Sequence, residues 1–151
     1  MNGMEKGNEE EKISIAKAEF ELCQRQMDKY DGSLDRVKSW AVTLWVAAMG
    51  WSFQTKNREI VLLVLVAVVM FWILDGLSKS FRQDYKARRD AVASALREYF
   101  NKGKFPEDFS SPVLPSHENR LGETLRSMFL FHTAFIYAIL IIVSLVVYGK
   151  M

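Results

Sequence analysis

SWAVTLWVAAMGWSFQT at residues 39–55 is followed by KNRE at 56–59 and IVLLVLVAVVMFWIL at 60–74, and this stretch decides the fold. A helix that spans a membrane needs roughly 20 mostly apolar residues, and so short a polar connection joins antiparallel neighbours. The stretch therefore predicts a transmembrane hairpin over residues 39–78. The alternative is a buried hairpin in a soluble protein, but a third apolar run follows in a chain of only 151 residues.

A helix with a heptad pattern is predicted before the hairpin. Residues 1–12 are charged, contain two glycines and are expected to form a disordered tail. Over residues 13–38 apolar or small side chains recur at alternating steps of three and four, which predicts a cytoplasmic amphipathic helix. Asp31-Gly32-Ser33 interrupts the pattern, and it either ends one helix and caps the next or is a weak point in one long helix.

The apolar seam of this helix has two interpretations. In the first, it packs against the second cytoplasmic helix of the same chain. In the second, it is an assembly surface between copies of the chain, formed by Ile13, Phe20, Met27 and Tyr30.

The chain after the hairpin alternates between helix and loop. Residues 78–102 contain neither Pro nor Gly, and they predict a helix that continues from the second membrane helix and ends at Gly103. The prolines that follow exclude a helix, and a short helix is expected between Ser116 and Arg126. Residues 79–126 are thus predicted to be a cytoplasmic helix and proline-containing loop, and residues 127–149 a third transmembrane helix. The predicted fold class is all-α with three transmembrane helices.

Basic residues determine the predicted orientation of these spans. They concentrate just before residue 39 and between residues 79 and 126, whereas few lie beside the hairpin loop or the C-terminus. By the positive-inside rule, the N-terminus and the 79–126 segment face the cytoplasm. The hairpin loop and the C-terminus are expected on the opposite side.

Composition and motifs exclude several other classes of protein. A formal net charge of +2 gives no reason to expect duplex nucleic acid as a partner. The single cysteine, Cys23, excludes an internal disulfide and an all-cysteine metal site. There is no nucleophile elbow or phosphate loop, and His117 has no second ligand at metal-binding spacing. We therefore expect no enzyme, no cofactor and no metal.

Two ionisable residues fall inside the apolar segments. Asp75 and His132 are predicted at similar depths near the cytoplasmic interface, where such residues usually pair or face water. They indicate a gate or ion-pathway site; the alternatives are a hydrated interfacial pair or a bond from Asp75 to Lys79. Small residues on the first span continue the seam, so this span is expected to line a hydrophobic pore. The tentative pore residues are Leu44, Ala48 and Trp51.

A basic cluster follows the hairpin. Its cations and interleaved aromatic ring suit a phosphate-bearing ligand, although basic residues beside a membrane also attract anionic headgroups. The candidate ligand-binding residues are Lys79, Arg82, Tyr85, Lys86, Arg88 and Arg89.

The order of these segments, with WAVTLW at Trp40–Trp45 and FWILDGLSKSF at Phe71–Phe81, resembles the SLATT family of small bacterial membrane effectors. The resemblance covers roughly Ile13–Lys102, and the chain departs from the family plan by its third span. It implies an inner-membrane effector of anti-phage systems, found beside nucleotide-signalling enzymes. Effectors of the Hailong type, controlled by the product of a companion nucleotidyltransferase, are the nearest specific example.

The function expected from the residues and the resemblance together is an ion channel or pore in anti-phage defence. A single chain with three spans has no room for a water-filled pore, so we expect a homo-oligomer, a tetramer, in the lipid bilayer. A nucleotide or oligonucleotide from the partner nucleotidyltransferase would gate it. The alternative function is a non-conducting membrane anchor or adaptor that recruits a soluble partner.

Overall fold

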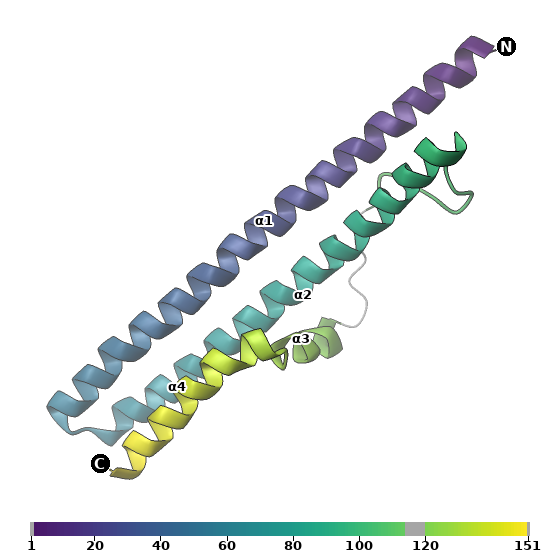
Figure 1. Cartoon of the computed structure of the whole chain (residues 1–151). Coiled ribbons are helices and arrows are strands. Elements are labelled where there is room, and N and C mark those ends of the chain that lie inside the picture. The colour runs from purple at the N-terminus through teal and green to yellow at the C-terminus, as the bar shows by residue number, and fades with distance from the viewer. Residues whose placement is uncertain (1, 114–119, 151) are drawn as a thin grey trace. The chain divides into compact units, whose positions relative to one another are not determined.

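The computed structural model describes residues 2–113 and 120–150, with the side chains of 2–8, 120–121 and 131–132 left aside. Four helices make up the described part: α1 (Asn2–Thr55), α2 (Arg58–Lys102), α3 (Arg120–Met128) and α4 (Phe131–Lys150), as Figure 1 shows. No strand occurs in these residues, so the all-α prediction is confirmed.

The N-terminal half of the chain is a single helix. α1 begins at Asn2, so the prediction of a disordered tail over 1–12 is wrong for residues 2–12. This segment contains four Glu and two Lys, which favour helix, and it continues a helix that is already formed. α1 also runs through Asp31-Gly32-Ser33 without a break, so the long-helix alternative holds.

The predicted hairpin turn lies at Lys56 and Asn57, between α1 and α2. Lys56 adopts a positive φ of 52° and reverses the chain. The Asn57 side chain accepts the backbone N–H of Glu59 at 2.9 Å, which caps the start of α2. The buried Ser52 hydroxyl donates to the Asn57 carbonyl at 3.1 Å and ties the turn to the end of α1.

α2 is one continuous helix from the apolar run into the charged segment, and it ends at Lys102 as Gly103 predicts. Gly103 has a φ of 75° and donates its N–H to the Tyr99 carbonyl at 2.7 Å. A left-handed glycine at this position is a common helix stop.

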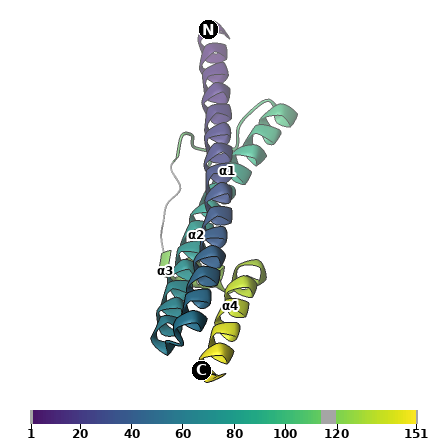
Figure 2. The same ribbon diagram turned by 90° about the vertical axis from the view of Figure 1, so that its left-hand side faces the viewer.

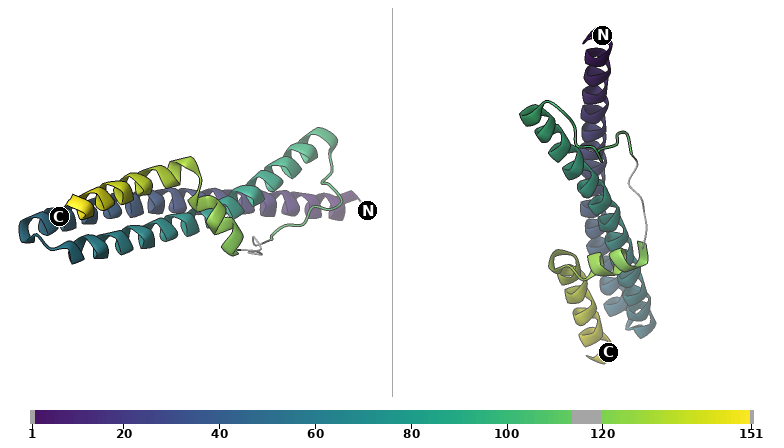
Figure 3. Two further views of the ribbon diagram at one scale, coloured as in Figure 1. Left: turned by 90° about the horizontal axis from the view of Figure 1, so that it is seen from below. Right: turned by 90° about the vertical axis from the view of Figure 1, so that its right-hand side faces the viewer.

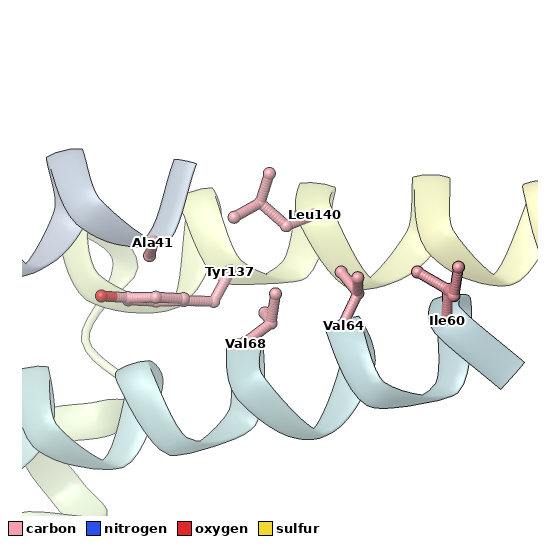
Figure 4. Close-up of a cluster of buried hydrophobic side chains, with 6 residues drawn as sticks. All are labelled: Ala41, Ile60, Val64, Val68, Tyr137 and Leu140. Atoms are coloured by element: carbon pink, nitrogen blue, oxygen red, sulfur yellow. The ribbon is translucent and has the colours of Figure 1, made fainter. Parts of the chain in front are cut away.

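The chain divides into two compact units. Unit 1 comprises Met1–Lys29 and Phe81–Glu118, and unit 2 comprises Tyr30–Ser80 and Asn119–Met151. In unit 2, α4 lies beside the C-terminal part of α1 and the N-terminal part of α2 (Figures 2 and 3). Its core, drawn in Figure 4, consists of Ala41, Ile60, Val64, Val68, Tyr137 and Leu140.

The predicted third transmembrane helix over 127–149 differs from the structure at its start. Ser127 and Met128 belong to α3, and α4 begins only at Phe131. The Trp72 indole N–H donates to the Met128 carbonyl at 3.0 Å and satisfies an orphan acceptor at the end of α3. α4 then starts with the N–H groups of Thr133 and Ala134 both bonded to the Leu130 carbonyl.

Two helices of the described chain are long and apolar enough to cross a membrane. They are α2 and the Thr133–Lys150 part of α4. The apolar end of α1 is not one of them, because Trp, Ser, Gly and Gln interrupt its aliphatic residues. The three-span architecture and its orientation stay predictions.

Candidate functional site

Large apolar side chains cover the outside of unit 2. The two candidate membrane segments bury only 28% and 22% of their apolar windows, which is low for core helices of a water-soluble protein. Contiguous exposed apolar surface of this extent marks a membrane or protein contact. Among the most exposed are Trp40, Val46, Trp51, Phe53, Leu63, Val66, Met70, Phe129 and Ile142.

The three tentative pore residues of α1 lie in one apolar groove. Leu44, Ala48 and Trp51 line it from α1, and Leu63 and Ala67 are among its residues on α2. The groove has a volume of about 300 Å³, and every side chain in its lining is apolar. These three residues share one face of α1, and the structure places them against α2 of the same chain.

Asp75 is the most unusual polar residue of unit 2. It is 0% exposed, and neither carboxylate oxygen has a hydrogen-bond partner among the described residues. The equally buried Tyr137 lies next to it and interacts with it, but without a hydrogen bond of ordinary geometry. Asp35 and Lys38 of α1 and Lys79 of α2 are its charged neighbours. A carboxylate buried this way is costly in free energy, which makes Asp75 a candidate functional residue.

Of the two predicted partners of Asp75, the structure describes the side chain of Lys79 only. Among the described side chains of α4, Tyr137 is the neighbour of Asp75; sequence reasoning missed this residue, and a hydroxyl in an apolar run was the available signal. The Lys79 ammonium donates to the Thr133 hydroxyl at 2.9 Å, and no hydrogen bond joins it to Asp75. His132 lies in α4, but its side chain is outside the described residues.

Polar contacts also fasten α4 to α1. The Trp45 indole N–H donates to the Ser144 hydroxyl at 2.8 Å, and that hydroxyl donates to the Leu140 carbonyl at 2.7 Å. Hydrogen bonds of this kind join helices where no water competes for the same groups. Trp45 and Ser144 had not been predicted as a pair, because nothing in the sequence relates two residues so far apart.

The basic cluster is divided between the two units. Lys79 belongs to unit 2, and the other candidate ligand residues belong to unit 1. Arg89 bonds to Asp90 at 2.7 Å and to Gln24 at 3.2 Å. Lys86 is exposed, whereas Arg82 and Tyr85 are half-buried. The side chains of the cluster that belong to unit 1 therefore differ in exposure and in bonding, and they do not form one uniform basic surface.

Arg88 is engaged inside unit 1. Its guanidinium makes two hydrogen bonds to the Glu19 carboxylate, at 2.7 and 3.1 Å. A third bond, at 2.6 Å, reaches the Ser110 carbonyl of the loop after α2. Glu19 also accepts the Ser111 hydroxyl and, at 3.1 Å, the Val113 backbone N–H. Neither Glu19 nor this loop contact had been predicted.

These donors change the acidity of the groups around Glu19. Burial raises the pKa of Glu19, but the hydrogen bonds from Arg88, Ser111 and Val113 outweigh it, so the net pKa lies below the ordinary value of 4.5. Burial, and then the negative charge of Glu19, raise the pKa of the Cys23 thiol. Glu19 is therefore ionised and Cys23 is a neutral thiol at neutral pH.

The predicted assembly seam of α1 is partly used within the chain. Met27 is buried, and Ile13, Phe20 and Tyr30 are half-buried. In unit 1 the bonds Glu19–Arg88 and Gln24–Arg89 hold this part of α1 beside α2. Of the two interpretations of the seam, packing against the chain's own second helix is the one that the contacts of unit 1 favour.

Comparison with known proteins identifies no relative of this chain. No family model, curated protein or solved structure matches the chain. The function is therefore argued from the residues.

Proposed function

We propose that the protein is an integral membrane protein that forms an ion channel as a homo-oligomer. The observation that carries this proposal is Asp75, a buried carboxylate with no hydrogen-bond donor among the described side chains, inside a unit whose exterior is apolar. An apolar exterior suits lipid, and ionisable residues in the interior of membrane segments mark ion pathways or relays. An anchor needs no such residue.

The proposed architecture has three spans: the apolar end of α1, the N-terminal part of α2, and α4. The end of α1 is held to α4 by the Trp45–Ser144 bond and shares the groove with α2, which supports a common depth in the bilayer. The N-terminus and residues 79–126 would face the cytoplasm, and the C-terminus the periplasm of a bacterial inner membrane. Several copies, four in our proposal, would surround the pore.

Control by a nucleotide or oligonucleotide, and a role in anti-phage defence, complete the proposal. The resemblance to SLATT effectors supports both, together with the exposed Lys86 near the half-buried Arg82 and Tyr85. Arg88 is a poorer candidate for this ligand, since a phosphate would have to displace Glu19 from it.

The test of conduction uses purified full-length protein in liposomes loaded with a potassium-sensitive dye. A channel releases ions at a rate that rises with the protein-to-lipid ratio, whereas an anchor or adaptor leaves the liposomes tight.

Orientation is tested in cells carrying Cys23→Ser with Asn57→Cys, Lys104→Cys or Gly149→Cys. A membrane-impermeant maleimide should label positions 57 and 149 but not 104; absence of label at 57 would rule out the first span.

Ala48→Asn is expected to make the channel leak. Ala48 lies in the apolar groove of α1, and a polar amide there would wet a hydrophobic constriction. The liposome assay should show ion release several-fold faster than for the parent protein. Val66→Asn is the matched control, because Val66 is 63% exposed and does not line the groove. Equal effects of the two changes would contradict the assignment of α1 to the pore lining.

A further inference from the structure

The loop that follows α2 is fastened to unit 1 by stacked aromatic rings. The Phe105 ring lies 4.8 Å from that of Tyr99 in the last turns of α2, and Phe109 stacks on Phe105 with centroids 5.1 Å apart. The Arg88 guanidinium lies over the Phe109 ring at 5.8 Å. These contacts hold the loop against one face of α2.

A single carboxylate connects this loop to both helices. Glu19 comes from α1 and binds Arg88 of α2, the Ser111 hydroxyl and the Val113 backbone N–H. It is only 6% exposed, and its donors come from α2 and from the loop, so three segments of the chain meet at this carboxylate. A buried carboxylate is stable only when such donors surround it. The docking of the loop therefore depends on the contact between α1 and α2 at Glu19.

The same chain contains an ordinary ion pair for comparison. Glu21 and Arg25 lie on the outer face of α1 at 3.2 Å, with 65% and 77% of their side chains exposed. Exposed pairs of this kind contribute little to stability. Glu19 differs because its removal takes the carboxylate acceptor away from the half-buried Arg88 and from the Val113 N–H.

We propose that Glu19 holds the loop over residues 104–113, here called the strap, in its docked position. The strap stays docked only while α1 and α2 hold the register that brings Glu19 opposite Arg88. A displacement of α1 along α2 by one helical turn, about 5.4 Å, would carry the carboxylate out of reach and release the loop. The strap is thus a sensor of the alignment of the two helices, and it does not depend on whether the protein conducts ions.

Release of the strap changes the length of chain that leads to α3. With Val113 held, the link to Arg120 consists of residues 114–119 and reaches at most about 25 Å. With the loop undocked, the free link starts at Gly103 and reaches about 60 Å. Docking of the strap therefore shortens the free link before α3, and its release lengthens that link.

The first test is Glu19→Ala in the full-length protein, in detergent or nanodiscs. Hydrogen exchange at the Val113 amide should accelerate at least tenfold, and trypsin should cut faster after Lys104. Glu21→Ala is the matched control and should change neither rate. Unchanged exchange and cleavage in Glu19→Ala would show that the aromatic stack alone holds the loop, and the proposal would be wrong.

Two further variants keep the proposal testable if Glu19→Ala fails to fold. Ser111→Ala leaves the Glu19–Arg88 pair in place and should still accelerate exchange at Val113, by a smaller factor. Glu19→Arg combined with Arg88→Glu restores an ion pair between the helices, but arginine has no acceptor for Ser111 or Val113. The loop should therefore stay free in the swapped protein. A loop that docks again there, or a Ser111→Ala protein with unchanged exchange, would overturn the three-way role.

Acid should release the strap only at low pH. The folded-state pKa of Glu19 lies below its ordinary value of 4.5, so its stabilising effect is present above that value and is lost as the pH falls through the lower one. Arg88 is the charged partner of Glu19. A spin label at Lys104→Cys, in a Cys23→Ser background, should stay immobile at neutral pH and become mobile only once the pH falls below 4.5. Mobility that begins near pH 6 would contradict the proposal that ionised Glu19 holds the strap docked.

Discussion

Asp75→Asn is expected to make the detergent-solubilised protein more stable and, in the same preparation, to reduce its ion flux. The carboxylate is 0% exposed and has no hydrogen-bond donor among the described residues. The neutral amide has nearly the same shape, and its N–H groups can donate to the Tyr137 hydroxyl beside it. Removal of a buried unsatisfied charge should raise the free energy of unfolding by about 1–3 kcal/mol. Thermal unfolding followed by circular dichroism measures this gain.

The loss of flux follows if the charge is kept for conduction in spite of its cost. Proteins often give up stability at functional positions, so opposite changes in stability and activity identify such a residue. Asp28→Asn is the matched control: Asp28 is exposed on α1 and is not among the charged neighbours of Asp75, so the same chemical change there should alter neither quantity appreciably. A less stable Asp75→Asn protein would show that the carboxylate is bound to Lys38 or Lys79, and would remove the main support for the channel.

The long-range plan of the helices could be predicted from local patterns. Apolar runs around KNRE predicted the turn at residues 56–57, and the absence of Pro and Gly after residue 78 predicted an uninterrupted α2. Both features depend on propensities of neighbouring residues, which a single sequence displays. The same reasoning failed at residues 2–12, since a charged tail and the first turns of a long helix have similar compositions.

Side-chain partners across helices were not predictable in the same way. Depth and spacing suggested His132 or Lys79 as the partner of Asp75; the structure puts Tyr137 beside Asp75 and bonds Lys79 to Thr133, and the His132 side chain is outside the described residues. Helix spacing gives the face on which a residue lies but not the rotation of the facing helix. Glu19 and Arg88 illustrate this limit too, because their pairing also requires a loop whose course no periodicity encodes.

Gly76→Ala is expected to detach α3 from α2. A Cβ atom at Gly76 would lie 2.2 Å from Met128 Cγ and 3.3 Å from the Thr124 carbonyl oxygen, and the first distance is impossible without movement. Met128 is buried, and its carbonyl is held by Trp72, so it has little freedom to withdraw. Overpacking of this kind should lower the free energy of unfolding by about 1–3 kcal/mol. It should also expose Ser127 and Thr124, the buried polar residues of α3.

The control and the rescue for this prediction are both present in the chain. Gly50 lies inside α1 with nothing within 4 Å of the equivalent Cβ position, so Gly50→Ala should stabilise the helix by up to about 1 kcal/mol. The same substitution is thus expected to have opposite signs at the two glycines. Met128→Ala removes the clashing Cγ atom, so the double variant Gly76→Ala/Met128→Ala should be at least as stable as Met128→Ala alone. Thermal unfolding of the four variants measures these differences. If the two alanines at 76 and 128 instead destabilise additively, the close approach of α3 to α2 at Gly76 is not what makes the glycine necessary.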